Sequence, residues 1–380
     1  MKKLCVRFFN ACLLILLQSC ATFVPPDQYS CFEAAAVLRN SPVRLGITDL
    51  TEHRMQHKIK LIKNRSDIGA GTRGSDMGVD AIEIAAINQN NDFFNRFEFE
   101  DVKTHNETIY AKVHNSFAKR IEHVCEQCTR VCDSVQNSIR KGYFPLVFSG
   151  DHSSALGTIS GIKTAMPEKT LGVIWIDAHA DLHSPYTSPS GNIHGMPLAA
   201  AMADDNLACQ INDITGNTKK YWEAMKNIGL PGAKIHGGHI VYFGVRDTEQ
   251  PEEKQMERLG IRNYTVAEIR HRGIKPCVEE ALDLLSACEV IYISFDVDSL
   301  DCDMVSRGTG TPVPKGFDPS EVRTIIQQAL RSGKVVCLEI AEVNPLLDTH
   351  GNKMAETAFQ VLTHVTDSLL FQLTFGRLPR

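Results

Sequence analysis

The chain has 380 residues, of which 43% are hydrophobic, and it carries a formal net charge of -5. A chain of this length buries roughly three quarters of its unfolded surface if it folds as one α/β domain, so we expect a large core. The weak negative charge and the lack of a long basic run argue against a nucleic-acid-binding surface, because such a surface neutralises phosphates with Lys and Arg. A small polar molecule is the better expectation for a substrate, and no nucleic acid is expected as a partner.

The first 20 residues differ from the rest of the chain. A basic start is followed by an apolar run at 8–17, which at about ten residues is too short to span a bilayer but typical of a signal peptide. The following Leu17-Gln18-Ser19-Cys20-Ala21 resembles a bacterial lipoprotein site, with a lipid anchor on Cys20, although a small residue is usual at the position of Gln18. This pattern predicts a location in the bacterial cell envelope. There are two alternatives: the leader is not cleaved, or the start codon is assigned too far upstream and the protein is cytoplasmic.

We therefore divide the chain into a leader (1–20), a tether (21–56) and a main domain (57–380). Strands are expected at 58–63, 144–149, 171–176, 240–244, 290–295 and 335–339. Helices are expected at 114–141, 221–227, 276–287 and 319–332, the last with Asp318 at its N-cap and Glu321 three residues later. The alternation favours a largely parallel sheet that is covered on both faces. The polar segment at about 204–238 is interpreted as a surface insertion.

Polar clusters follow four of the predicted strands. They read Gly150-Asp151-His152, Asp177-Ala178-His179-Ala180-Asp181, Asp296-Val297-Asp298 and Glu339-Ile340-Ala341-Glu342. Residues two apart on an extended backbone point the same way, so Asp177, His179 and Asp181 would line one side of a strand end, where α/β sheets place their ligand sites.

Such a group of buried carboxylates cannot all ionise without counter-charge, and two divalent cations would supply it. His152 and His179 would each add a nitrogen ligand. The mixture of carboxylate and imidazole suits Mn²⁺, with Co²⁺, Fe²⁺ or Zn²⁺ as substitutes. A single Asp of this kind is usually a cap or turn residue, and it is the distribution over three strands that favours a metal site.

These motifs resemble those of the ureohydrolase family, the arginases and agmatinases. The stretch 177–197 (DAHADLHSPYTSPSGNIHGMP) is similar to the arginase branch in particular, and the resemblance extends from about Asp67 to beyond Pro345. It implies a three-layer α/β/α fold with a mainly parallel eight-stranded sheet and a homo-oligomer, often a trimer. It also implies that 57–380 is a ureohydrolase catalytic domain that holds two Mn²⁺ per subunit.

Carried over position by position, the resemblance implies two overlapping sets of metal ligands. One ion would be bound by His152, Asp177, Asp181 and Asp296, and the other by Asp177, His179, Asp296 and Asp298. A hydroxide held between the ions would attack the guanidinium carbon of L-arginine and release urea and L-ornithine.

The resemblance also implies roles around the substrate. His194 would transfer a proton to the leaving amine, Glu342 would bind the guanidinium, and Thr311 would lie near it. The α-amino acid end would be bound by His183, Ser190, Asn192 and Glu249. The sequence departs from the family pattern at His183, where many arginases have Asn, at Glu249, where Asp is usual, and at Cys302, where Pro is usual.

Two other functions remain open at this point. The first is an agmatinase or another guanidino-compound amidinohydrolase, against which the arginase-like Ser190-Gly191-Asn192 segment speaks. The second is a catalytically silent, metal-binding envelope lipoprotein, against which the retention of all six ligands with His194 and Glu342 speaks.

Two further patterns receive a structural interpretation. The spacing Gly69-x-Gly71-x-x-Gly74 fits a dinucleotide fingerprint by letter count, but no acidic residue closes a second strand about 20 positions later, so turn glycines are expected. His236 and His239 precede a predicted strand in a polar segment and are interpreted as loop histidines.

Overall fold

The computed structural model describes residues 59–375, and eight strands in this range form one sheet in the order β2-β1-β3-β8-β7-β4-β5-β6. All neighbouring strands are parallel. The strands are β1 (Ile59–Asn64), β2 (Glu98–Asp101), β3 (Phe144–Ser149), β4 (Leu171–Ile176), β5 (Ile240–Phe243), β6 (Arg262–Tyr264), β7 (Val290–Asp296) and β8 (Val335–Ala341). The predicted leader, the tether and Cys20 lie outside the described residues.

The six predicted strands are confirmed to within a residue or two at each end. The strands β2 and β6 were not predicted, because they are only four and three residues long and lack an apolar run. Both lie at the edges of the sheet, where one side has no neighbouring strand. An edge strand does not need the continuous apolar sequence that marks a strand buried on both faces.

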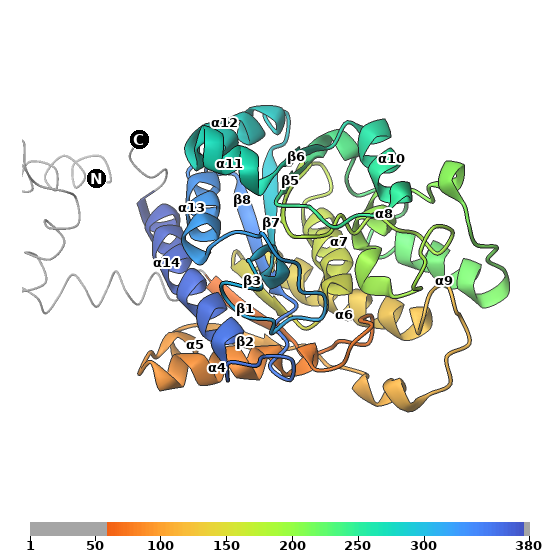
Figure 1. The fold of residues 1–380 in the computed structure, drawn as a ribbon, viewed down its shortest axis with the longest axis horizontal. Helices are drawn as coiled ribbons and strands as arrows, with labels where there is room; N and C mark the ends of the chain where they lie inside the picture. The colour runs from red at the N-terminus through yellow and green to blue at the C-terminus, as the bar shows by residue number, and fades with distance from the viewer. Residues whose placement is uncertain (1–58, 376–380) are drawn as a thin grey trace, which may run out of the picture. The chain divides into compact units, whose positions relative to one another are not determined.

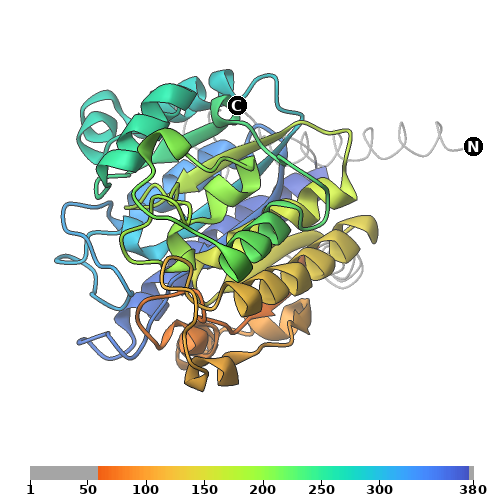
Figure 2. The ribbon, with the colours of Figure 1, turned by 90° about the vertical axis from the view of Figure 1, so that its right-hand side faces the viewer.

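Two layers of helices cover the sheet, as Figures 1 and 2 show. One layer contains α4 (Gly78–Asn88), α5 (Phe93–Arg96), α11 (Val266–Arg272), α12 (Ile274–Leu284), α13 (Pro319–Leu330) and α14 (Lys353–Phe375). The other contains α6 (Ile121–Arg140), α7 (Ala155–Ala165), α8 (Pro197–Met202), α9 (Gly216–Lys226) and part of α10 (Gln250–Leu259). Alternate strand residues enter the two cores: Ile174 and Ile176 face one layer, while Val173 and Trp175 face the other. The three-layer α/β/α fold is therefore confirmed.

The predicted helices are present with shifted ends. The start of α6 falls at Ile121 rather than at 114, because Arg120 has a left-handed backbone with φ of 56°. The capping box of α13 is confirmed: Asp318 accepts from the N–H of Glu321 at 3.0 Å, and the Glu321 carboxylate accepts from the N–H of Asp318 at 2.8 Å. Within the segment 204–238, α9 begins at Gly216 and buries Trp222 in the core, so this segment contributes packing.

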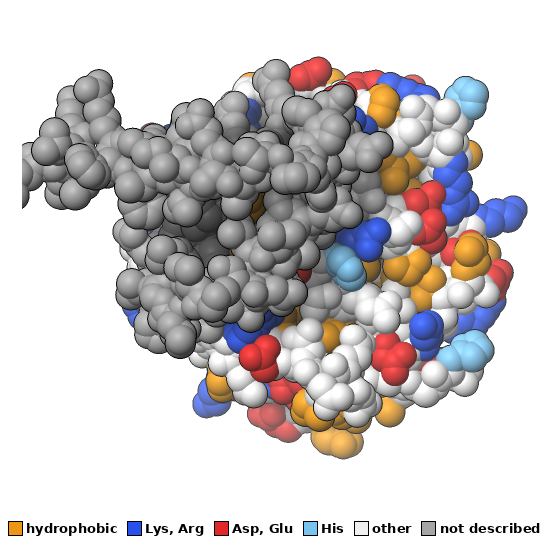
Figure 3. All heavy atoms as spheres, turned by 90° about the vertical axis from the view of Figure 1, so that its left-hand side faces the viewer, with side chains coloured by type: hydrophobic (Ala, Val, Ile, Leu, Met, Phe, Trp, Pro, Cys, Tyr) orange, Lys and Arg blue, Asp and Glu red, His pale blue; other side chains and the backbone are white. Residues whose placement is uncertain are grey.

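The surface carries charges of both signs. In the coloured part of the face shown in Figure 3, basic and acidic side chains lie interspersed with hydrophobic ones. None of the helices in the described part of the chain combines the length and the apolar character that a membrane crossing requires.

The strands that precede the polar clusters are neighbours in the sheet. His152, Asp177, Asp296 and Glu342 follow or end β3, β4, β7 and β8, which occupy the middle of the strand order as β3-β8-β7-β4. Parallel strands end at the same edge, so the fold alone brings these four residues together.

The close packing of α6 against α7 can be tested by a substitution. A Cβ on Gly157 in α7 would lie 2.5 Å from the carbonyl oxygen of Cys128 and 2.8 Å from the Cβ of Val131, both in α6. We expect Gly157→Ala to lower the free energy of unfolding by about 1–3 kcal/mol, because the two helices must separate. Thermal or urea unfolding measures the change. Gly238→Ala is the control, since its Cβ would meet open space; equal stability of the two variants would contradict the prediction.

Candidate metal centre

The metal-ligand candidates are presented by the loops that follow the central strands. His152 begins a short 3-10 helix after β3, Asp177 directly follows β4, and Asp296 ends β7. The expectation that Asp177, His179 and Asp181 converge through alternation along an extended strand is wrong. The chain bends after β4, and Asp181 has a left-handed backbone with φ of 52°.

The convergence instead depends on hydrogen bonds inside these loops. The N–H of His179 donates to the Asp177 carboxylate at 2.7 Å, and the N–H of Asp298 donates to the Asp296 carboxylate at 2.8 Å. Each aspartate thus stabilises a turn in the loop that carries the following ligand candidate. Such hydrogen bonds between a side chain and the nearby backbone favour a turn over an extended strand.

A first group surrounds the Nδ1 atom of His152. This atom lies 3.0 Å from a carboxylate oxygen of Asp177, 3.2 Å from Asp181 and 3.0 Å from Asp296. All four side chains are buried. The Nδ1 atom of His152 and the Oδ2 atom of Asp177 make no hydrogen bond within the described residues, so two buried polar atoms face each other unsatisfied. A cation between them would satisfy both.

A second group adjoins the first. The Nδ1 atom of His179 lies 2.9 Å from Asp298 and 3.6 Å from the other oxygen of Asp177. Asp177 therefore contacts both histidines, one through each oxygen, as a bridging ligand would. Asp296 lies against His152, and its second oxygen accepts from the N–H of Asp298. The six predicted ligands thus form one continuous cluster.

The charges of this cluster require cations. Burial, followed by repulsion from Asp298 and Asp177, raises the pKa of Asp296 well above its ordinary value. Burial and the neighbouring Asp177 raise the pKa of Asp181 to about 6. Burial also opposes ionisation of Asp177, but the neighbouring imidazoles of His152 and His179 outweigh it and lower its pKa. The carboxylates can all be ionised only beside strong positive charge, and two divalent cations bound by N and O ligands fit this donor set.

Neighbouring groups hold the first histidine in place. The Nε2 atom of His152 lies 2.7 Å from the hydroxyl of Ser294, and its ring stacks on Trp175 with centroids 4.1 Å apart. A partner on the second ring nitrogen orients a metal-binding histidine. Trp175 therefore packs in the core against a metal-ligand candidate.

The remaining predicted residues line the same cavity of about 260 Å³. Glu342 has a buried carboxylate that accepts from the N–H of His152 at 2.9 Å and pairs with His194 Nδ1 at 3.2 Å. The hydroxyl of Thr311 donates to the Asp298 carboxylate at 3.1 Å, so Thr311 touches a metal-ligand candidate. Ser190 and Asn192 complete one part of the lining.

A further part of the lining is acidic, and the sequence analysis named only one of its carboxylates. His183 Nε2 lies 2.9 Å from Glu249 and 3.5 Å from Glu252, and Asp247 also borders the cavity. Burial raises the pKa of Glu252 to about 7. Glu249, which the family resemblance implied, and Glu252, which the sequence analysis missed, form the capping box of α10. The spacing of carboxylates after β5 was the signal that could have revealed Glu252.

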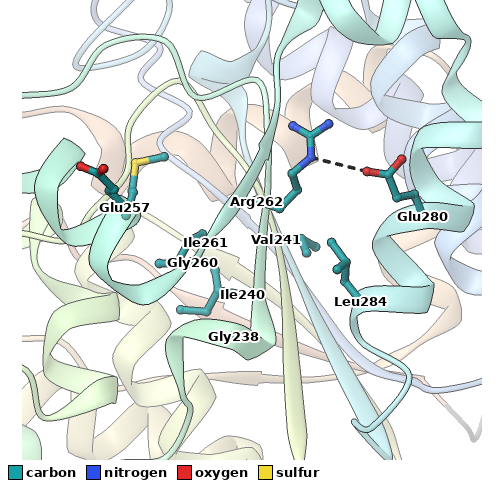
Figure 4. Close-up of a pocket in the computed structure, with 10 residues that line it drawn as sticks. Gly238, Ile240, Val241, Glu257, Gly260, Ile261, Arg262, Glu280 and Leu284 are labelled. Carbon is teal, nitrogen blue, oxygen red and sulfur yellow. Dashed lines mark ion pairs between the residues drawn. The ribbon is translucent and has the colours of Figure 1, made fainter.

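A larger cavity of about 460 Å³ lies elsewhere, between β5, β6 and the ends of α10 and α12 (Figure 4). Apolar side chains line most of it, and the Arg262 guanidinium is paired with Glu280 at 3.5 Å. None of the residues that line this larger cavity is a histidine, so it lacks the combination of carboxylates and imidazoles found at the metal centre. His236 and His239 lie in a turn that precedes β5, as expected of loop histidines.

The glycines near residue 70 lie in a turn whose backbone is hydrogen-bonded to two aspartates. The N–H of Gly69 donates to the buried Asp151 carboxylate at 2.9 Å, and the N–H of Gly74 donates to Asp67 at 2.7 Å. The turn-glycine interpretation is confirmed.

A cluster of His and Asp side chains at the central strand ends is typical of hydrolases that use a pair of metal ions. The model of the arginase family matches residues 57–366. The arginase of Bacillus subtilis (strain 168) is 34% identical over 310 residues, which cover 81% of this chain and 97% of that protein. The chain therefore belongs to the arginase family, and it is an amidinohydrolase.

The comparison of structures agrees with this assignment. The native arginase of Bacillus caldovelox has a TM-score of 0.68 at 31% identity, with 81% of this chain and 98% of that chain covered. The fold is also shared with a formimidoylglutamase from Bacillus subtilis (TM-score 0.62) and a hypothetical agmatinase from Burkholderia thailandensis (TM-score 0.59), each 19% identical.

Removal of one ligand tests the cluster. We expect Asp298→Ala to bind one divalent ion per subunit instead of two, because His179 then loses its nearest carboxylate. Metal analysis after Mn²⁺ loading and dialysis gives the stoichiometry. Asp283→Ala is the control, since Asp283 is exposed on α12 and does not line the cavity. Two ions retained by the Asp298 variant would contradict the ligand assignment.

Proposed function

We propose that this amidinohydrolase converts L-arginine and water to L-ornithine and urea, with two Mn²⁺ per subunit. The observation that carries the proposal is the position of Glu342. Its buried carboxylate borders both the metal cluster and the cavity that holds Ser190, Asn192 and Glu249.

Glu342 is suited to bind a guanidinium group. One oxygen accepts from the backbone of His152, a metal-ligand candidate, so a cation bound to Glu342 would lie beside the cluster. A carboxylate and a guanidinium pair in a planar, bidentate geometry that fixes orientation as well as distance. The backbone φ of 67° at Glu342 is unfavourable for a residue other than glycine, and such strain of about 1–3 kcal/mol is typical of functional positions.

His194 is placed to handle a proton at the same position. Two divalent cations, when bound, would lower the pKa of a water molecule between them and so supply the nucleophile. Burial disfavours protonation of His194, but its pairing with Glu342 outweighs this and raises its pKa to about 9. An arriving guanidinium competes for the same carboxylate, which weakens that pairing. His194 then becomes a stronger acid and donates its proton more readily to the leaving amine.

The rest of the cavity supports a substrate with an α-amino acid end. Ser190 and Asn192 offer hydroxyl and amide groups for a carboxylate, whereas Glu249 and Glu252 offer negative charge for an ammonium. Agmatine has no carboxylate and would leave the first set of groups without partners. Ser190 is exposed and Asn192 is half-buried, so the discrimination would come from the hydrogen bonds to the carboxylate that agmatine cannot make.

By the same family resemblance we propose a homotrimer. The lipid anchor at Cys20 and the envelope location stay predictions from the leader sequence.

Urea release tests the proposed reaction. After loading with Mn²⁺ or Co²⁺, we expect urea from L-arginine and at least a hundredfold lower kcat/KM with agmatine, because its missing carboxylate leaves polar groups unpaired. Glu342→Gln should lose at least a hundredfold in kcat/KM while it retains both metal ions. Faster cleavage of agmatine would make the enzyme an agmatinase, and no urea from any guanidino compound would favour a silent metal-binding protein.

The competition between His194 and the substrate predicts a pH dependence. Below the His194 pKa of about 9, a guanidinium ion must displace an imidazolium from Glu342, so its binding weakens as the pH falls. We expect the inhibition constant of guanidinium chloride to decrease between pH 7 and 9, by up to about tenfold per pH unit, and then to level off. In His194→Asn this dependence should disappear. A constant that does not vary with pH in the wild type would argue against the competition.

A further inference from the structure

The loop that contains Ser190 and Asn192 is held by the segment that precedes α6. The backbone N–H of Lys119 donates to the carbonyl oxygen of Gly191 at 2.7 Å. Gly191 has φ of 72°, and a Cβ at this position would overlap the carbonyl oxygen of Ser116. Residues 116–119 therefore lie directly against this loop, which restricts where the Lys119 side chain can go.

The Lys119 ammonium determines how the Asn192 amide is oriented. The Nζ atom of Lys119 lies 3.1 Å from Oδ1 of Asn192. An ammonium only donates hydrogen bonds, so the atom that faces it must be the amide oxygen rather than the nitrogen. The NH₂ group of Asn192 consequently points away from Lys119.

Gly71 provides the space for that NH₂ group. A Cβ on Gly71 would overlap Nδ2 of Asn192. The backbone of Gly71 is not among the left-handed positions, so space rather than backbone conformation requires the glycine. The middle glycine of the Gly69-x-Gly71-x-x-Gly74 pattern thus acts with Lys119 on one side chain.

The charge of Lys119 is also directed at this amide. Its side-chain hydrogen bond goes to the neutral Asn192 rather than to a carboxylate of the described residues. Lys226, by contrast, is paired with both Asp205 and Glu223. An ammonium without an acidic partner beside a cavity favours a negative group of the ligand.

We propose that Lys119 is a specificity-determining positioning residue, which together with Gly71 holds the Asn192 NH₂ group ready for the α-carboxylate of the substrate. The inference rests on the proposed hydrolysis of L-arginine and extends it to two residues that do not line the cavity. Lys119 acts through Asn192, and its charge adds to the preference for a carboxylate.

The first experiment replaces the charge and compares ligands with and without a carboxylate. We expect Lys119→Met to raise the KM for L-arginine and the inhibition constant of L-ornithine by about tenfold to a hundredfold, as for the loss of a charge-assisted hydrogen bond. The kcat should change less than about twofold, and so should the inhibition constant of putrescine, which lacks the carboxylate. Lys119→Arg should recover part of the loss. Lys112→Met, an exposed lysine of the same segment, is the matched control and should behave as the wild type.

The second experiment tests whether Lys119 acts through Asn192. Gly71→Ala should weaken L-ornithine binding while leaving putrescine binding unchanged, because the new Cβ displaces the NH₂ group. In an Asn192→Ala background, the effect of Lys119→Met on L-ornithine should fall below about threefold, since residues that act as a unit are not additive. A full Lys119→Met effect in that background would overturn the positioning role.

Different results would contradict the proposed function and the role of Lys119. A wild-type enzyme that releases no urea from L-arginine contradicts the proposed function. A wild-type enzyme that does so, with equal losses for L-ornithine and putrescine in Lys119→Met, contradicts only the role of Lys119. Metal content and thermal unfolding of each variant exclude general damage to the fold as the cause.

Discussion

The structure depends on the need to neutralise four buried aspartates that converge beside two histidines. Asp177, Asp181, Asp296 and Asp298 are almost fully buried, and this burial, followed by their mutual repulsion, raises the pKa of three of them, Asp181, Asp296 and Asp298. The side chains of residues 59–375 satisfy this charge poorly, because among them His152 Nδ1 and Asp177 Oδ2 find no hydrogen-bond partner. The cluster is therefore built for divalent cations, and much of the surrounding fold serves to keep its members in place.

Both the sheet and the short turns after its strands hold the cluster in place. The parallel sheet brings β3, β8, β7 and β4 to one edge, but the ligands reach their positions through turns stabilised by the aspartates themselves. The left-handed backbone at Asp181 and Glu342 is the strained part of this arrangement. Such strain persists only where the surroundings determine the conformation, and here the carbonyl oxygen of Asp181 accepts from the N–H of Leu198 while the N–H of Glu342 donates to the carbonyl oxygen of Gly150.

The cavity beside the cluster has two chemically different parts. Glu249 and Glu252 place carboxylates near His183, while Asn192 and Ser190 offer neutral donors behind which Lys119 adds a positive charge. A ligand with both an ammonium and a carboxylate matches this division, and Glu342 is the carboxylate that we propose for the guanidinium. The proposed substrate, an amino acid with a guanidino side chain, therefore rests on the placement of charge more than on the shape of the cavity.

The sequence by itself determined which residues are candidates for the chemistry and which strands precede them. Apolar runs buried on both faces identify β1, β3, β4, β5, β7 and β8, and the Asp and His residues that end them are too costly to bury without a function. Tertiary structure decided the rest. The edge strands β2 and β6 have no apolar run to reveal them, and the turn after β4 replaces the extended strand that alternation suggested. Glu252 and Lys119 lie far along the chain from His183 and Asn192, the residues they contact, and only the tertiary packing of separate loops brings each pair together.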